Sequence, residues 1–228
     1  MFKIFDKSYS QFLVIGLGRF GFEVTKTLFE MGKDVLAIDL DEDKINEVVN
    51  YSTHAIIADA SEEGVLEKIG LRNFEVAIIC TSNNLETSIL TTMLCKQAGL
   101  HVICKAKNDK HKKVLEKIGA DQVLVPEAEI GHKVATMLTS PRLSDVMELT
   151  QGYVLAEIAL PFVWDGKSLL ELDIRKKYGV SVLIIKREND VIINPAGSTI
   201  IKHGDYVIVG GEISLISKFT KKIADIKK

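Results

Sequence analysis

The sequence predicts an α/β fold in which a doubly wound parallel sheet is followed by a smaller α+β domain. Over the first 138 residues, apolar segments of strand length alternate with helical segments and short connections, a pattern that predicts βαβ units and a parallel sheet. After residue 138 the segments follow a different spacing. We therefore expect an N-terminal domain over residues 1–138, a connection over 139–149 and a C-terminal domain over 150–228.

The expected strands of the N-terminal domain are nearly continuous apolar runs, which indicates burial on both faces of a sheet. They lie at residues 11–16, 34–39, 54–59, 75–81, 101–106 and 121–126. Helices are expected at residues 19–31, 41–52, 61–70, 83–99, 109–119 and 127–138. This order of strands and helices predicts helices on both faces of the sheet.

The C-terminal part is expected to begin after a segment that contains Pro141 and several polar residues, which we interpret as a connection or a crossover helix. Glu188, Asn189 and Asp190 are expected to form a hairpin turn between two strands. Strands are predicted at residues 153–161, 180–187, 190–195 and 205–211, and helices at 168–179 and 215–226.

Composition excludes several classes of protein. The formal net charge of -2 argues against general nucleic-acid binding, so no nucleic-acid partner is expected. No apolar run approaches the ~18 residues of a membrane-spanning helix, and the N-terminus is too polar for a signal peptide, so we expect a cytoplasmic chain. Three cysteines without metal-ligand spacing, Cys80, Cys95 and Cys104, are interpreted as buried small hydrophobes.

A glycine-rich loop, Gly16-Leu17-Gly18-Arg19-Phe20-Gly21, follows the first strand and opens a helix. Gly16 permits a tight turn, Gly18 lets a phosphate approach the backbone, and Gly21 allows close packing of helix on strand. Asp39 ends the second strand, where it would accept hydrogen bonds from ribose hydroxyls and disfavour the 2′-phosphate of NADP. This context predicts a nucleotide site; the alternative is a structural turn that binds nothing.

Polar residues follow three further strands of the same predicted sheet, and the carboxyl ends of such strands border the ligand crevice. They are Asp59, Ala60 and Ser61, then Thr81, Ser82 and Asn83, and finally Lys105. Ser61 and Asn83 could each cap a helix instead, since both precede predicted helices. Together these residues support a nucleotide site.

No acid–base group suited to catalysis accompanies this site in the sequence. The five histidines, His54, His101, His111, His132 and His203, are scattered, and each is interpreted as a surface or strand-end residue. We therefore expect a binding protein rather than an enzyme. A small NAD-dependent oxidoreductase remains the alternative.

Several segments resemble the RCK (KTN) family, related to TrkA, and within it the KtrA-type cytosolic subunits of bacterial Ktr potassium-uptake systems. They include FLVIGLGRFG, AIDLDEDK, VICKAKN, VLEKIGADQVLVPE and, near the C-terminus, LDIRKKYGVSVLIIKR and GDYVIVGG. The resemblance implies that dimers assemble into an octameric ring, which docks on a KtrB-like potassium-translocating subunit at the inner face of the membrane. It also implies that ATP activates, that ADP inactivates, and that NAD(H) can bind.

The same resemblance implies roles for individual residues. Arg19 would reach the terminal phosphate of a nucleotide across a subunit interface. Glu127 would help hold Mg²⁺, Ca²⁺ or Na⁺ at that interface, although its position alone is also that of a helix N-terminal acid. In the C-terminal domain, Ile174, Arg175 and Val182 lie where some relatives bind cyclic di-AMP, in a segment that would otherwise serve as a packing helix.

Overall fold

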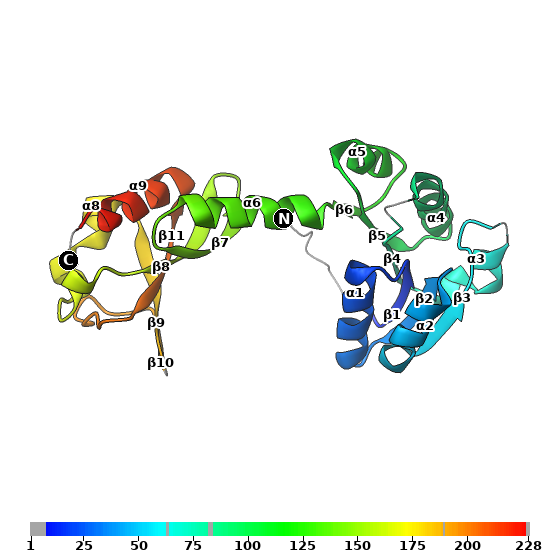
Figure 1. Ribbon diagram of the computed structural model, residues 1–228, viewed down its shortest axis with the longest axis horizontal. Helices are drawn as coiled ribbons and strands as arrows, with labels where there is room; N and C mark the ends of the chain where they lie inside the picture. Colours follow the sequence, from blue (N-terminus) through cyan, green and yellow to red (C-terminus); the bar gives the residue numbers. More distant parts are fainter. Residues whose placement is uncertain (1–7, 63, 82–83, 189, 227–228) are drawn as a thin grey trace. The chain divides into compact units, whose positions relative to one another are not determined.

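The computed structural model describes residues 8–62, 64–81, 84–188 and 190–226. Contacts divide the chain into two compact units (Figure 1), one ending at Ala128 and the other beginning at Glu129. The division therefore falls earlier than residue 138, because residues after Ala128 contact the second unit, as in the ion pair between Lys133 and Asp145 at 2.6 Å. No helix in the described ranges is long and apolar enough to span a bilayer.

The N-terminal unit contains a six-stranded parallel sheet with the order β3-β2-β1-β4-β5-β6. This order and the helices on both faces confirm the predicted doubly wound fold. The strands are β1 (Gln11–Ile15), β2 (Asp34–Asp39), β3 (His54–Ile57), β4 (Val76–Ile79), β5 (His101–Lys105) and β6 (Gln122–Leu124).

Helices cover both faces of this sheet (Figure 1). On one face, apolar residues of α1 (Arg19–Glu30) and α2 (Glu42–Val48) join one hydrophobic core. On the other, α3 (Val65–Lys68), α4 (Leu85–Gln97) and α5 (Asp109–Lys117) join a second core. Two single-turn helices, η1 (Val49–Tyr51) and η2 (Leu71–Asn73), and α6 (Pro126–Thr139) complete the elements.

The helix expected over residues 61–70 is shorter than predicted. It begins only at Val65, because Gly64 takes the left-handed conformation with φ of +80°. A turn closed by the Asp59 carboxylate, which accepts from the Ser61 N–H at 2.8 Å, occupies the residues before it. Gly70, with φ of +74°, ends the segment as the helix-end glycine predicts.

The second unit contains a five-stranded sheet with the order β10-β9-β11-β8-β7 and antiparallel pairing throughout. It confirms the prediction of a second α+β domain. Its strands are β7 (Leu143–Thr150), β8 (Tyr153–Ala159), β9 (Ser181–Arg187), β10 (Asp190–Ile193) and β11 (Tyr206–Glu212). Its helices are η3 (Phe162–Trp164), α7 (Leu169–Leu172), α8 (Ile174–Tyr178) and α9 (Ile213–Ala224).

The prediction of a connection or crossover helix over residues 139–149 is wrong. Residues 143–150 form strand β7, which pairs with β8 at the edge of the sheet. The strand is mostly exposed and its register shifts twice, so its sequence carries little of the apolar alternation that marks a strand. Pairing with β8 is a tertiary effect that the local sequence does not reveal.

The core of the second unit lies on one face of its sheet. Along β8, buried Val154, Ala156 and Ile158 alternate with more exposed residues. Phe219 of α9 is fully buried against the rings of Trp164 and Tyr178. Helices α8 and α9 pack against each other and supply this cover.

In this unit one predicted helix is interrupted and one predicted hairpin is confirmed. The helix expected over 168–179 is broken into α7 and α8 at Asp173, whose φ is +50°. Strands β9 and β10 pair as a hairpin with Arg187 opposite Asp190, as predicted, and Asn189 of its turn lies outside the described residues.

Candidate nucleotide site

The glycine-rich loop lies against the carboxyl end of β4. Gly16 has φ of +92°, and its N–H donates to the carbonyl of Ile38 at 2.8 Å. A Cβ atom at Gly16 would lie 3.0 Å from backbone atoms of Cys80 and Thr81. A Cβ atom at Gly21 would lie 1.9 Å from the carbonyl oxygen of Gly16. These two positions therefore require glycine, for the turn and for the helix packing that the sequence predicts.

Gly18 differs from the other two glycines. It is the residue before α1, with φ of −64°, and no atom of the described residues lies within 4 Å of the position that its Cβ would occupy. No side chain caps this end of α1, and the first turn contains no acidic residue. The free N–H groups at the helix start and the open space beside Gly18 suit an anionic group such as phosphate.

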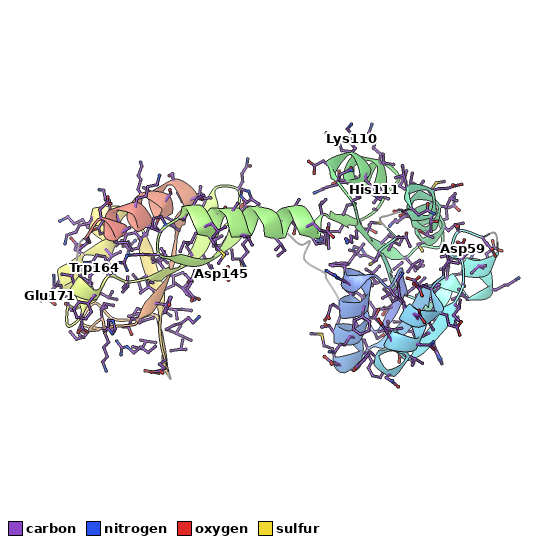
Figure 2. The ribbon with its side chains drawn as sticks, viewed as in Figure 1. Asp59, Lys110, His111, Asp145, Trp164 and Glu171 are labelled. Atoms are coloured by element: carbon purple, nitrogen blue, oxygen red, sulfur yellow. The ribbon has the colours of Figure 1, made fainter. Side chains whose placement is uncertain are left out.

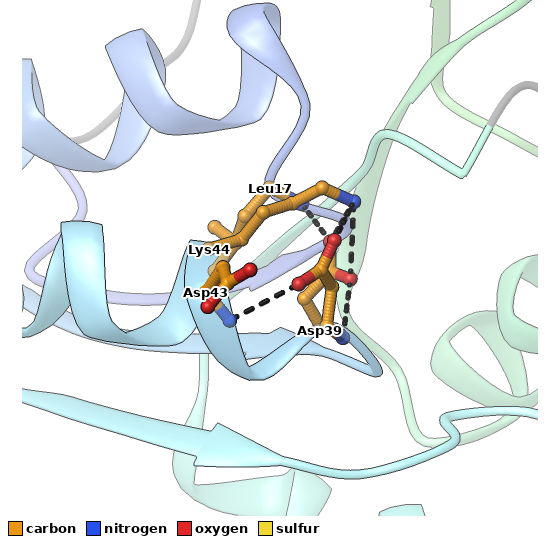
Figure 3. A network of polar contacts seen from close by, with 5 residues as sticks. Leu17, Asp39, Asp43 and Lys44 are labelled. Atoms are coloured by element: carbon orange, nitrogen blue, oxygen red, sulfur yellow. Dashed lines mark hydrogen bonds and ion pairs between the residues drawn. The ribbon is translucent and has the colours of Figure 1, made fainter.

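Asp39 connects the glycine loop to the start of α2 (Figure 3). Its Oδ2 accepts from the Leu17 N–H at 2.6 Å, and its Oδ1 accepts from the Asp41 N–H at 3.0 Å. Lys44 places its ammonium 3.4 and 3.5 Å from the two carboxylate oxygens. The carboxylate thus stands at the end of β2 as predicted, already hydrogen-bonded to the loop that would bind the phosphates.

A small pocket of about 70 Å³ opens at this edge of the sheet. It brings together several of the predicted site residues, namely Gly16, Asp39, Asp59, Ala60 and Thr81. The Thr81 Oγ1 atom is buried and has no hydrogen-bond partner among the described residues. Ser61 donates through its hydroxyl to Asp59 at 2.6 Å, so its role is to close a turn rather than to cap α3.

Lys105 and Glu127 form an ion pair on the far side of the glycine loop. The Lys105 ammonium lies 2.6 Å from Glu127 Oε1 and 6.0 Å from the centre of the Phe20 ring. The Lys105 side chain is 17% exposed and that of Glu127 is 67% exposed. The hydrogen bond from Lys105 is the largest cause that lowers the pKa of Glu127. The end of β5, the first turn of α6 and the glycine loop therefore meet here.

Arg19 is the first residue of α1 and its side chain is exposed. Within the part of the chain that the structure describes, its guanidinium makes no hydrogen bond or ion pair. Ser82 and Asn83 lie outside the described residues. Asn84 caps α4 by accepting from the Thr87 N–H at 3.1 Å, so the capping role suggested for Asn83 belongs to its neighbour.

The interpretation of all five histidines as surface or strand-end residues is wrong for His111. It is 6% exposed and lies 3.2 Å from the Ser88 hydroxyl of α4, while its Nδ1 accepts from the Lys107 N–H at 3.3 Å. Burial lowers its pKa. The signal in the sequence is its spacing of four residues from Leu115, which places both on the apolar face of α5.

The cysteines behave largely as predicted. Cys95 and Cys104 are buried, and Cys80 is partly exposed. Burial raises the pKa of Cys80 to about 12, of Cys95 to about 12 and of Cys104 to about 11. These thiols are therefore protonated and unreactive at neutral pH.

The candidate ligand residues of the C-terminal unit differ in accessibility. Ile174 is buried in the core, Arg175 is exposed and Val182 is partly buried. A cavity of about 670 Å³ in this unit is lined by Lys186 and Arg187 among others, and by none of these three residues. Both cations already form ion pairs there, Lys186 with Glu157 at 2.8 Å and Arg187 with a buried aspartate. Lys202 also lines this cavity; it is exposed and forms no ion pair with another residue that the structure describes.

The fold and this edge of the sheet define a class of protein, a Rossmann-type nucleotide-binding domain joined to an antiparallel-sheet domain. The TrkA-N domain family matches residues 12–126, and the TrkA-C domain family matches residues 155–224. The chain belongs to the TrkA family, which confirms the resemblance seen in the sequence.

Similar proteins extend over nearly the whole chain. The Ktr system potassium uptake protein C of Bacillus subtilis is 43% identical over 95% of this chain and 99% of its own length. The Ktr system potassium uptake protein A of the same organism is 41% identical over 92% and 95%. A solved structure of the GsuK channel bound to NAD matches the fold with a TM-score of 0.51 and 21% identity, over 96% of this chain and 39% of that one.

Proposed function

We propose that this protein is a cytoplasmic, nucleotide-controlled regulatory subunit of a membrane potassium-uptake system. The observation that carries the proposal is the identity of 41–43% to Ktr potassium uptake proteins over more than nine-tenths of both chains. The candidate nucleotide site at the glycine loop supports control by a nucleotide. The protein has no catalytic role in this proposal, and the nucleotide acts as an effector.

ATP, ADP and NAD(H) are the ligands that this site would take. Gly18 and the start of α1 leave room for phosphate, and Asp39 stands at the position that recognises an unmodified ribose. Because Asp39 is anionic, NADP should bind poorly. The unpartnered Thr81 hydroxyl at the same edge would gain a partner from a ligand.

Arg19 would distinguish ATP from ADP. Its exposed guanidinium, without a partner in the described residues, stands at the start of α1 where phosphates would lie. An arginine donates several charge-assisted hydrogen bonds to phosphate. In this proposal ATP favours the active state and ADP the inactive state, because a ligand shifts an equilibrium only by its difference in affinity for the two states.

Assembly into dimers, and of dimers into an octameric ring, would complete the site. Helix α6 presents Ile130, Val134 and Leu138 to solvent at spacings of four residues, which places three exposed apolar side chains on one face. A second copy of the chain would cover such a face. The ring would dock on a KtrB-like translocating subunit at the inner face of the membrane.

Two further ligands complete the proposal. A cation such as Mg²⁺, Ca²⁺ or Na⁺ would bind at Glu127, where the Lys105 ammonium now supplies the positive charge. Within the described residues no three His, Cys, Asp or Glu side chains gather closely enough to hold a metal, so such a site would need the nucleotide or a second chain. Cyclic di-AMP would bind in the C-terminal unit near Arg175.

The proposal is tested by titrating the purified protein with ATP, ADP, NAD and NADP. Arg19→Ala should weaken ATP binding by about tenfold or more and ADP binding much less, since a shielded charge-assisted contact contributes about 1.5–3 kcal/mol. Arg72→Ala, which removes another exposed arginine of the same unit, is the control and should change neither affinity. In vesicles that contain the translocating subunit, Arg19→Ala should abolish stimulation of potassium flux by ATP.

Equal losses of ATP and ADP affinity in Arg19→Ala would contradict the role of Arg19. Equal affinity for NAD and NADP would contradict the role of Asp39. Consumption of NADH with a small carbonyl substrate would favour the alternative, an oxidoreductase, over a regulatory subunit.

A further inference from the structure

Helix α5 carries a row of lysines on its outer side. Lys110, Lys113 and Lys117 are exposed and follow spacings of three and four residues, which places them on one face of the helix. His111 and Leu115 occupy the opposite, buried face. Figure 2 shows Lys110 projecting outward from α5, with His111 on the inner side of the helix. These three lysines are called the α5 stripe below.

The α5 stripe is not neutralised by the rest of the described chain. Residues 105–117 contain six lysines and two acidic residues, whereas the whole chain has a net charge of -2. Lys105 pairs with Glu127, and Lys96 on the neighbouring α4 pairs with Asp121. None of the three stripe lysines forms an ion pair with another residue that the structure describes.

Two features of this placement are unfavourable for the helix, although Lys117 in the last turn is favoured by the helix dipole. Lys110 lies in the first turn of α5, where the helix dipole disfavours a cation. Lys113 follows it by three residues and Lys117 follows Lys113 by four, so like charges are neighbours along the face. An anionic surface in contact with the stripe would remove both penalties.

We propose that the α5 stripe contacts the anionic headgroups of a lipid bilayer. The inference rests on the proposed function, which brings the protein to the inner face of a membrane. A cluster of four to eight basic residues on or beside an amphipathic helix is the composition that binds acidic lipids. The three stripe lysines form such a cluster of five together with Lys107, which precedes the helix, and Lys112, which is half-buried on another side of it.

Chemistry favours lipid over an acidic protein segment as the occupant. All the cations are lysines, which are flexible point charges, whereas specific pairing with protein carboxylates favours the planar fork of arginine. Val114, 38% exposed, lies beside the stripe. It lines a shallow hollow of about 370 Å³ with Lys113, Glu116 and Lys117, which offers space for a headgroup. The stripe extends for roughly 10 Å, from the rise per residue of a helix.

The test is co-sedimentation of the full-length protein with vesicles. We expect binding to vesicles of phosphatidylcholine mixed with the acidic lipid phosphatidylglycerol, and none to vesicles of phosphatidylcholine alone. High salt should abolish the binding. The triple variant Lys110→Ala, Lys113→Ala, Lys117→Ala should reduce the partition coefficient on the order of 100-fold, about fivefold for each lysine.

A triple variant of equal charge, Lys176→Ala, Lys218→Ala, Lys221→Ala, is the matched control and removes exposed lysines of α8 and α9. It should keep most of the binding; an equal loss would show that only overall charge matters and would overturn the proposal. Unchanged vesicle binding in the α5 variant would also overturn it. Binding of poly-glutamate through α5 without vesicle binding would assign the stripe to an acidic protein segment instead.

The nucleotide titrations separate this inference from the proposed function. None of the stripe lysines belongs to the candidate nucleotide site, so the α5 variant should bind ATP as the unaltered chain does. If the unaltered chain binds no nucleotide, the proposed function fails, whatever the vesicles show. If the α5 variant binds both ATP and vesicles normally, only the lipid contact fails. Circular dichroism of the α5 variant should match the parent, because exposed alanines favour a helix.

Discussion

The two sheets of this protein bury their residues in different ways. In the parallel sheet, strand β4 is buried along its whole length, because helices cover both faces. In the antiparallel sheet, strand β8 is buried only at alternate positions, because the core lies on one face. The carboxyl ends of all parallel strands meet at one edge, whereas antiparallel strands alternate in direction. The proposed nucleotide site accordingly lies at the edge of the first sheet where the strand ends converge.

Because the two sheets differ in this way, we expect residues of the two units to contribute differently to stability and to nucleotide binding. In the C-terminal unit, residues such as Phe219 hold a core together, whereas in the N-terminal unit the glycine loop packs against the sheet and, in the proposed function, also binds the nucleotide. Substitutions in the two units should accordingly give different combinations of lost stability and lost nucleotide affinity.

The largest effect is expected from Phe219→Ala in the C-terminal unit. Phe219 is fully buried between Trp164 and Tyr178, and removing a buried phenylalanine ring costs about 3–5 kcal/mol. Urea unfolding should show this loss, while nucleotide affinity measured below the transition should stay the same. Phe162→Ala, at a residue that is 59% exposed, is the control and should change stability little. A parallel loss of nucleotide affinity in Phe219→Ala would show that the two units are tightly coupled.

Gly21→Ala should have the next largest effect and should act on the other unit. Its Cβ would lie 1.9 Å from the Gly16 carbonyl oxygen, and backbone shifts of this kind cost about 3 kcal/mol. Both stability and nucleotide binding should fall, as measured by thermal unfolding and titration. Gly18→Ala, at a position where the added Cβ would have no described atom within 4 Å, should keep the stability and lose only phosphate affinity. Equal stability of the two variants would refute the packing role of Gly21.

His111 should give a smaller, pH-dependent effect. Burial lowers its pKa in the folded chain, so the unfolded chain binds more protons once the pH falls below about 6.5. The contribution of His111 to stability is therefore complete above that pH and is lost as the pH falls toward the folded pKa. His111→Gln should cost about 1–2 kcal/mol at neutral pH, from the disturbed hydrogen bonds.

Unfolding measured from pH 8 to pH 5, a window set by the usual histidine pKa, should give a flatter profile for His111→Gln than for the parent chain. His54→Gln, at an exposed position, is the control for the substitution itself and should change stability at neutral pH little. An unaltered profile in His111→Gln would mean that another group causes the acid sensitivity.

The smallest effect is expected at the ion pair between Lys105 and Glu127. Lys105→Met should raise the pKa of Glu127, since the hydrogen bond from Lys105 is what lowers it, and NMR titration of the carboxyl carbon measures this directly. Because the folded pKa is lowered, the pair stabilises the protein above about pH 4.3 and loses this effect as the pH falls through the folded pKa. The loss of stability should not exceed ~0.5 kcal/mol, since Glu127 is largely exposed. A larger loss would mean that α6 depends on this contact.

Prediction from sequence succeeded where a local pattern carried the information and failed where distant residues decided. The six parallel strands, the glycine loop and the place of Asp39 at the end of β2 could be predicted because apolar runs and glycine spacing are properties of adjacent residues. Strand β7 was missed because its strand hydrogen bonds come from β8 on one edge only, and the local sequence does not reveal that pairing. His111 was missed because a single histidine on an apolar helix face is a weak signal until α4 packs against it.

The sequence by itself determined the order of elements, the doubly wound sheet, the turn at Gly16 and the family of the protein, because these depend on periodicity, glycine conformation and motif spacing. Only the tertiary structure decided which charges meet. It joined Lys105 to Glu127, joined Asp39 to the Leu17 N–H, and left the α5 stripe without an ion pair to any residue that the structure describes. The physical reason is that ion pairs and hydrogen bonds act over a few ångströms between side chains from different elements, and the packing of the sheet alone sets those distances.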